Sequence, residues 1–277
     1  MIVQNLKLIF EKNKEKSPLY IQSLLKEQLQ YYVLNYIYNS PYGENFLFKG
    51  GTCLRFCFDL PRLSEDLDFD VLNYDQFNFE EFEKNLTYYF KNKLQFEDFA
   101  IKITGFNKLI YLQFPVLSKI GIPVSKPTKN VLFIRVDLAP VSGNGYKTEI
   151  SMKSTNDFSF LMKRYSLSDL FVGKISAILQ REKWEGKVRE ARFKGRDYFD
   201  LWWFLEKKTK PNMKYLQTIL QQDEKSIKTK LLEKVNLAIQ RKEELKNDLL
   251  PFFADSQFVI NFINNLQGLT SEIEKSL

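Results

Sequence analysis

The chain has 277 residues and a net charge of +7, from 41 lysines and arginines against 34 aspartates and glutamates. It contains no histidine, which excludes Ser-His-Asp and Cys-His catalysis, zincin motifs and ribonucleases that use a histidine base. Mechanisms that combine carboxylates with a metal ion remain open, because the ion itself supplies the electrostatic stabilisation.

The sequence also indicates the cellular compartment. No apolar run approaches the ~20 residues that a membrane span needs. The N-terminus lacks the layout of a signal peptide, because charged residues follow a short apolar stretch from Glu11 onward. Cys53 and Cys57 are too few for a zinc cage and lie four apart on a predicted helix, where they bridge poorly. We therefore expect a cytoplasmic protein with reduced thiols and no membrane partner.

The first predicted elements lead into a glycine pair. Residues 1–40 have the apolar spacing of a helix, which Pro41-Tyr42-Gly43 ends. Residues 46–48 predict a short strand that runs into Gly50 and Gly51, and a further helix follows. Glycines let the backbone approach a phosphate closely, and the N–H groups at a helix start favour an anion.

Two acidic residues follow at alternate positions. Side chains alternate along a strand, so Asp66 and Asp68 point the same way and Leu67 points to the opposite face. Adjacent carboxylates repel each other unless a cation lies between them, and a hard-oxygen pair suits Mg²⁺. Together with the glycine pair, they predict a phosphoryl- or nucleotidyl-transfer site. The alternative is an edge strand whose aspartates, Asp70 included, are simply solvated.

The whole stretch 48–70 resembles the signature of the AbiEii-type nucleotidyltransferase toxins, a bacterial branch of the DNA-polymerase-β nucleotidyltransferase superfamily. The matching residues form a Gly-Gly-Thr-x-Leu-Arg opening and an Arg-x-Ser-x-Asp-Leu-Asp-Phe close: Gly50, Gly51, Thr52, Leu54, Arg55, Arg62, Ser64, Asp66, Leu67, Asp68 and Phe69. Asp59 stands where relatives tend to have glycine, so the turn there is expected to differ in shape.

The resemblance implies a third carboxylate on a neighbouring strand. After a helix over residues 77–96, strands are predicted at residues 101–104, 109–114 and 131–138. Asp137, near the end of the last of these, fits that third ligand, with Glu149 in reserve. The alternative for Asp137 is an ordinary aspartate at the end of a strand.

Two later helices resemble the family's remaining motifs. One is predicted over residues 168–179 and carries Lys174 near the edge of its apolar stripe. The other begins after Gly195 and places Asp197 and Asp200 on one face. By resemblance, Lys174 binds a triphosphate and Asp197 positions it or the nucleotide. The alternative is that Lys174 reaches solvent over the core while Arg196 and the two aspartates form an interhelical ion-pair network.

Basic residues gather between those two helices. Residues 181–196 contain seven lysines and arginines with Trp184 and Phe193 interleaved, a pattern that suits RNA. The residues expected to contact RNA are Arg181, Lys187, Arg189, Arg192 and Lys194. The alternative is a solvated lysine-rich face.

The predicted fold is α+β. Residues 1–160 form a nucleotidyltransferase-like mixed-sheet domain that includes an N-terminal helix, and residues 161–277 form a helical bundle. The mechanism hypothesis places Mg²⁺ (or Mn²⁺) on Asp66, Asp68 and Asp137. Gly50, Gly51, Thr52 and Lys174 hold the phosphates of an NTP, Ser64 contacts phosphate, and Arg62 supports the acid-bearing turn.

The resemblance implies transfer of a nucleoside monophosphate to an acceptor hydroxyl, at a tRNA 3′ end or on another RNA. The protein would then be the toxin of a toxin–antitoxin or phage-defence (abortive infection) system with a cognate antitoxin. Two alternatives remain open: a nucleotidyltransferase that modifies a protein or small molecule, and a non-catalytic module that binds nucleotide or RNA.

Overall fold

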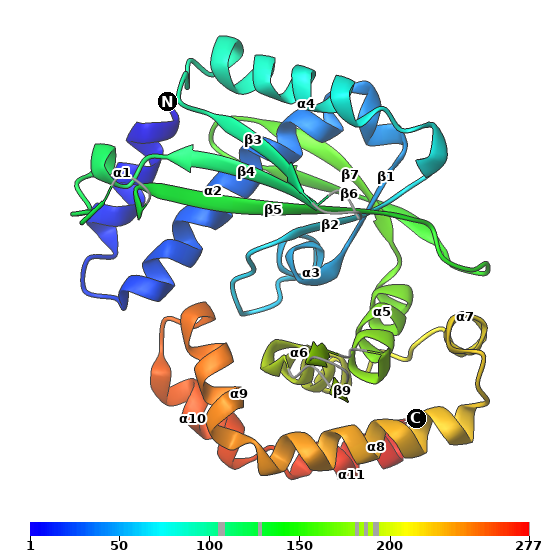
Figure 1. Ribbon diagram of the computed structural model, residues 1–277. Helices are drawn as coiled ribbons and strands as arrows, with labels where there is room; N and C mark the ends of the chain where they lie inside the picture. The colour runs from blue at the N-terminus through cyan, green and yellow to red at the C-terminus, as the bar shows by residue number, and fades with distance from the viewer. Residues whose placement is uncertain (105–108, 127–128, 181–182, 186–187, 191–193, 277) are drawn as a thin grey trace. The chain divides into compact units, whose positions relative to one another are not determined.

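The computed structural model describes residues 1–277 except 105–108, 127–128, 181–182, 186–187, 191–193 and 277 (Figure 1). The chain forms two compact units. The first contains Met1–Val141 and Ile150–Arg164, and the second contains Ser142–Glu149 and Tyr165–Leu277. In the described residues, no helix is long and apolar enough to cross a membrane.

A mixed sheet of seven strands organises the first unit, in the order β3-β4-β5-β2-β1-β7-β6. The strands are β1 (Phe46–Lys49), β2 (Leu67–Val71), β3 (Ala100–Thr104), β4 (Leu109–Pro115), β5 (Val131–Pro140), β6 (Thr148–Ser154) and β7 (Ser159–Tyr165). β2 runs antiparallel to β1 and parallel to β5. The aspartates of β2 therefore lie on an internal strand, and the alternative of a solvated edge strand is wrong.

The helices of the first unit are α1 (Ile2–Lys12), α2 (Pro18–Tyr38), α3 (Gly50–Phe58) and α4 (Phe79–Tyr88) (Figure 1). Short helical turns are η1 (Pro41–Glu44), η2 (Tyr74–Gln76), η3 (Tyr89–Lys93) and η4 (Ser118–Ile120). The single helix predicted for residues 1–40 is two helices, because Ser17 accepts a hydrogen bond from the Tyr20 N–H and Pro18 starts a new helix.

Aromatic packing defines the apolar face of the sheet. Phe46 of β1 contacts Phe82 of α4, and Phe69 of β2 contacts Tyr38 of α2. Leu67, Phe69 and Val71 are buried on this face, so the alternate residues of β2 point to the other one. One face of the sheet thus builds the core, and the opposite face carries the acidic residues.

The predicted strands at residues 101–104, 109–114 and 131–138 are confirmed as β3, β4 and β5. β6 and β7 were not predicted. Their pattern is obscured because Ile150, Met152 and Leu161 are exposed although apolar. β6 is an edge strand, which does not need the clean alternation by which half-buried strands are recognised, whereas β7 lies between β1 and β6 and places exposed Leu161 between buried Phe160 and Met162.

The second unit is mostly helical. Its helices are α5 (Leu167–Gln180), α6 (Gly195–Glu206), α7 (Met213–Leu220), α8 (Glu224–Gln240), α9 (Lys242–Leu249), η6 (Leu250–Phe252), α10 (Ser256–Asn264) and α11 (Gly268–Ser276). The predicted helical bundle over residues 161–277 also contains an antiparallel strand pair that was not predicted, β8 (Lys183–Glu185) and β9 (Val188–Glu190). The predicted α+β class, a mixed sheet followed by helices, is confirmed.

Candidate active site

The glycine pair lies against the acidic strand. Gly50 has φ +77°, and a Cβ added there would come within 2.0 Å of Asp68 Oδ2. A Cβ on Gly51 would lie 2.6 Å from Arg62 Nη2 and 2.9 Å from Ser64 Oγ. Only residues without a side chain fit at this turn. The start of α3 is therefore in direct contact with the Asp68 carboxylate.

Hydrogen bonds fasten the loop between α3 and β2. The buried Thr52 hydroxyl donates to the Asp66 carbonyl at 2.5 Å, and the buried Arg62 Nη1 donates to the Leu63 carbonyl at 2.8 Å. Gln30 of α2 donates to the Ser64 carbonyl at 3.1 Å. Arg62 thus lies where it supports the acid-bearing turn, and the Thr52 hydroxyl proton is used within the loop.

Asp59 ends α3 in the left-handed conformation, with φ 57° and ψ 40°. This is the conformation that glycine adopts most easily at a helix C-terminus, and aspartate is among the few other residues that tolerate it. The Asp59 N–H donates to the Leu54 carbonyl. The turn therefore has a glycine-type backbone although its residue is aspartate.

Strand register brings the carboxylates together. Asp68 and Asp137 are directly paired across the parallel strands β2 and β5. Asp66 precedes β2 by one residue and continues the same row. The three residues thus lie in one row on the acidic face of the sheet. Glu149 is on β6, which β1 and β7 separate from β2, and it belongs to the other compact unit.

An arginine lies within this acidic cluster of Asp66, Asp68 and Asp137. Arg135 Nη2 is 2.8 Å from Asp66 Oδ2 and 3.0 Å from Asp137 Oδ2. Burial by itself lowers the pKa of Arg135, but attraction to Asp66, Asp137 and Asp68 outweighs it and raises the pKa above its usual value. The guanidinium stays charged and neutralises part of the cluster.

Asp70, the next aspartate in the row, forms an ion pair with a lysine. Asp70 Oδ1 lies 2.5 Å from Lys49 Nζ, and the Asp70 side chain is buried. Lys49 is paired with Asp68 in the strand register, so its ammonium reaches diagonally along the acidic face. Asp70 is therefore in an internal ion pair.

Carboxylate oxygens on rigid strands are the donors that Mg²⁺ or Mn²⁺ prefers, and Asp66 and Asp137 already hold a cation, the Arg135 guanidinium. The donor set therefore fits a divalent ion on Asp66, Asp68 and Asp137. In their present rotamers, the described residues contain no group of three or more His, Cys, Asp or Glu arranged around one ion position.

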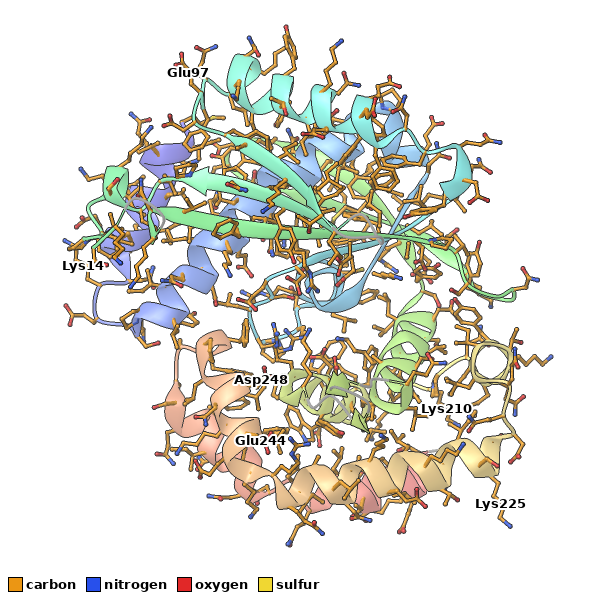
Figure 2. The ribbon with its side chains drawn as sticks, in the orientation of Figure 1. Lys14, Glu97, Lys210, Lys225, Glu244 and Asp248 are labelled. Carbon is orange, nitrogen blue, oxygen red and sulfur yellow. The ribbon has the colours of Figure 1, made fainter. Side chains whose placement is uncertain are left out.

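A second charged cluster lies within the helical unit. Lys174 Nζ of α5 is 3.2 Å from Asp197 Oδ1 and 2.6 Å from Asp200 Oδ2, both on α6. Lys174 does not reach out to solvent as the alternative supposed. Arg196 pairs with Asp248 of α9, labelled in Figure 2, through its backbone N–H at 2.9 Å and its Nε at 3.6 Å.

Close packing fixes α6 in this unit. A Cβ on Gly195 would lie 3.1 Å from the Leu245 Cα of α9, and the Phe171 and Phe204 rings stack at 4.3 Å between α5 and α6. The structure therefore brings the predicted residues together as two groups, one in each compact unit: Asp66, Asp68 and Asp137 with the glycine pair, and Lys174 with Asp197.

Most of the predicted RNA contacts cannot be placed. Arg181, Lys187 and Arg192 lie outside the described residues. The backbone of Arg189 belongs to β9, and the half-buried Lys194 precedes α6. The RNA assignment stays a prediction.

Arg135 and Lys49 were missed by the sequence reasoning. Arg135 precedes Asp137 by two residues on a predicted strand, so side-chain alternation alone puts both on one face. Lys49 directly precedes the glycine pair at the end of β1. A search for cations on the same face as the carboxylates would have found both.

A family model described as "Nucleotidyl transferase AbiEii toxin, Type IV TA system" matches residues 32–259. The crystal structure of JHP933 from Helicobacter pylori is 16% identical with a TM-score of 0.47, and the alignment covers 92% of this chain and 94% of that one. A crystal structure described as a "putative nucleotidyltransferase from H. pylori" is 15% identical with a TM-score of 0.47, covering 92% and 97%. No curated protein matches the sequence significantly.

Proposed function

Because the chain belongs to the AbiEii family and is thus a nucleotidyltransferase toxin of a type IV toxin–antitoxin system, we propose that it transfers a nucleoside monophosphate from an NTP to a tRNA 3′ end. The acceptor is the terminal ribose hydroxyl, and the cofactor is Mg²⁺ or Mn²⁺. The observation that carries this proposal is the pairing of Asp68 with Asp137 beside the turn at Gly50.

In the proposed reaction the acceptor oxygen attacks the α-phosphorus, a new P–O bond forms, and the bond to the β-phosphate breaks with loss of pyrophosphate. Asp66, Asp68 and Asp137 hold the divalent ion, which supplies charge neutralisation at the phosphates when it is bound. Asp137 also takes the proton of the attacking hydroxyl. Gly50 and Gly51 bring the backbone N–H groups of α3 to the phosphates, and Ser64 donates its hydroxyl to them.

For Lys174 and Asp197, the proposed roles are phosphate binding and positioning. The support is the resemblance of α5 and α6 to the later motifs of the family, and two buried carboxylates hold the ammonium of Lys174 at 3.2 Å and 2.6 Å. Such a lysine is confined to one orientation, and Asp197 contributes to that orientation. Asp200 completes the pair of carboxylates.

The proposed acceptor is RNA because the chain is basic overall and basic residues are concentrated at 181–196. A protein or a small molecule remains the second candidate acceptor. A cognate antitoxin is the expected partner in the cell.

The test is transfer of label from each α-labelled NTP, in the presence of Mg²⁺, to total bacterial tRNA. Asp68→Asn removes one charge from the cluster, while Asp75→Asn makes the same change at an exposed aspartate of η2. We expect labelled tRNA with the unmodified protein and with Asp75→Asn, and a loss of at least ~10³-fold with Asp68→Asn. Label on protein instead of RNA would change the acceptor. Equal activity of the two variants would remove Asp68 from the mechanism.

A further inference from the structure

Arg135 occupies a distinctive position in the acidic cluster. It lies two residues before Asp137 on β5, and its single Nη2 atom bridges Asp137 to Asp66 beside the neighbouring strand β2. The oxygens that it contacts, Asp66 Oδ2 and Asp137 Oδ2, belong to two of the three carboxylates of the proposed metal site. The guanidinium and a divalent ion therefore require the same side chains.

The two cations differ in the geometry that they impose. A guanidinium nitrogen stays 2.8–3.0 Å from each oxygen here, whereas Mg²⁺ draws its oxygens to about 2.0–2.1 Å. An ion between these carboxylates would also lie within a few ångströms of a positive charge that repels it. The carboxylates of Asp66 and Asp137, as they are now placed, cannot bind the guanidinium and a divalent ion at the same time.

Exposure allows an exchange. The Arg135 side chain is 31% exposed, and Asp66 and Asp137 are 21% and 28% exposed. A guanidinium in such a place can leave the carboxylates for water or for a phosphate, since its planar set of donors suits phosphate as well as carboxylate.

We propose that Arg135 is a built-in counter-cation of the active site, which holds Asp66 and Asp137 together before the metal binds and competes with it for the same oxygens. Entry of the divalent ion displaces the guanidinium from at least one of the two aspartates. Arg135 is thus a positioning residue that sets the metal affinity of the enzyme. This inference rests on the metal site of the proposed function.

The proposal predicts that removal of the positive charge tightens metal binding. Arg135→Gln should bind Mn²⁺ about tenfold more tightly than the unmodified protein, because the competing charge is gone. Arg135→Lys keeps the charge and should stay within about threefold of the unmodified protein. A residue with a merely structural role would weaken metal binding, or leave it unchanged, when replaced.

A matched control is available in the same unit. Arg55 is also 31% exposed and pairs with a single carboxylate, Glu27, at 2.9 Å. Arg55→Gln therefore removes an arginine of equal exposure from an ion pair outside the acidic cluster. Its Mn²⁺ affinity should equal that of the unmodified protein.

The full chain is titrated with Mn²⁺ in the absence of nucleotide, and electron paramagnetic resonance measures the concentration of free Mn²⁺ at each step. Arg135→Gln is purified in Mn²⁺ and its affinity is determined by competition with a chelator, so reduced stability of the metal-free variant does not prevent the measurement. Tighter binding by Arg135→Gln alone would support the proposal. Unchanged or weaker binding by that variant would overturn it.

One further variant separates this inference from the proposed function. Asp68→Asn, which leaves the arginine bridge in place, should weaken Mn²⁺ binding if the ion occupies the cluster. If Asp68→Asn binds as well as the unmodified protein, the metal site itself is wrong and the inference about Arg135 fails with it. If Asp68→Asn binds more weakly but Arg135→Gln shows no gain, the metal site stands and only the role of Arg135 is refuted.

Discussion

The two charged clusters use the same chemistry in different surroundings. On the sheet, Arg135 bridges two aspartates whose side chains are 21% and 28% exposed. In the helical unit, Lys174 contacts two aspartates whose side chains are 5% and 0% exposed. The side chains of the first cluster are thus more open to water than those of the second. The sheet cluster is therefore suited to exchanging cations, and the helical cluster links α5 to α6 while it orients the ammonium of Lys174.

The largest effect is expected from Lys174→Met, which removes the ammonium from two buried carboxylates. Breaking a buried pair on one side typically costs about 3–5 kcal/mol of unfolding free energy. Lys225→Met makes the same change at an exposed lysine of α8, labelled in Figure 2, and should cost less than about 0.5 kcal/mol. Denaturant unfolding of both variants checks the difference. If Lys174→Met lowers the free energy of unfolding by less than about 1 kcal/mol, the cluster does not contribute to stability as proposed.

Gly50→Ala tests the backbone beneath the sheet cluster. A side chain at φ +77° costs about 1–3 kcal/mol, and the added Cβ, 2.0 Å from Asp68 Oδ2, forces that carboxylate to rotate away. Gly121→Ala shares the backbone strain, with φ +90°, but has no atom within 4 Å. We expect both variants to lose stability, measured by thermal unfolding, with the larger loss for Gly50→Ala because of the added clash, and a loss of transfer activity for Gly50→Ala alone. If Gly50→Ala retains transfer activity, the close contact between Gly50 and the Asp68 carboxylate is not required for catalysis.

Arg135→Gln gives the counterpart of the lysine variant on the sheet. Because its partners are partly exposed, we expect a loss of only about 1 kcal/mol in the metal-free protein. The loss should shrink in 1 M salt, where the screening length falls to about 3 Å, whereas the loss in Lys174→Met should persist. Unfolding curves of both variants at low and high salt provide the test. Equal salt dependence would remove the distinction between the two clusters.

The smallest effect concerns the turn between α3 and the acidic strand. Asp59 has φ 57°, so Asp59→Gly relieves the strain of a left-handed residue. We expect a gain of up to about 1 kcal/mol in unfolding free energy and unchanged transfer. Asn73→Gly, at φ 59°, is a comparison position in a loop after β2. A destabilised Asp59→Gly protein would indicate that the aspartate side chain itself contributes to the turn.

Local sequence rules predicted the parts of the site that are close together in the chain. The alternation of side chains along a strand predicted that Asp66 and Asp68 lie on one face. The Gly50-Gly51 pair predicted a turn at which the backbone can approach a phosphate. The pairing of β2 with β5 could not be obtained this way, because Asp68 and Asp137 meet only through a parallel register between distant segments. Asp137 was identified through the family resemblance instead.

The misses have physical causes as well. The edge strand β6 exposes Ile150 and Met152, and β7 exposes Leu161 between buried apolar neighbours, so their apolar pattern does not distinguish inside from outside. β8 and β9 were not predicted because each has only three residues, too few to show the alternation of a strand. Arg135 was overlooked because only carboxylates were considered as site residues on the strand at residues 131–138. Its guanidinium affects which cations Asp66 and Asp137 can bind.

The path of the chain limits how the protein can be divided. It passes from one compact unit to the other three times, after Val141, Glu149 and Arg164. Residues 142–149 belong with the helices: the Lys147 N–H donates to Asp169 Oδ2 at 2.8 Å, and the Tyr146 ring contacts Tyr165 and Tyr215. A fragment cut at residue 161 would lose this segment and leave the start of α5 without its backbone donor. The helical part is therefore not a detachable module, and a fusion or truncation that preserves it has to carry residues 142–149 along.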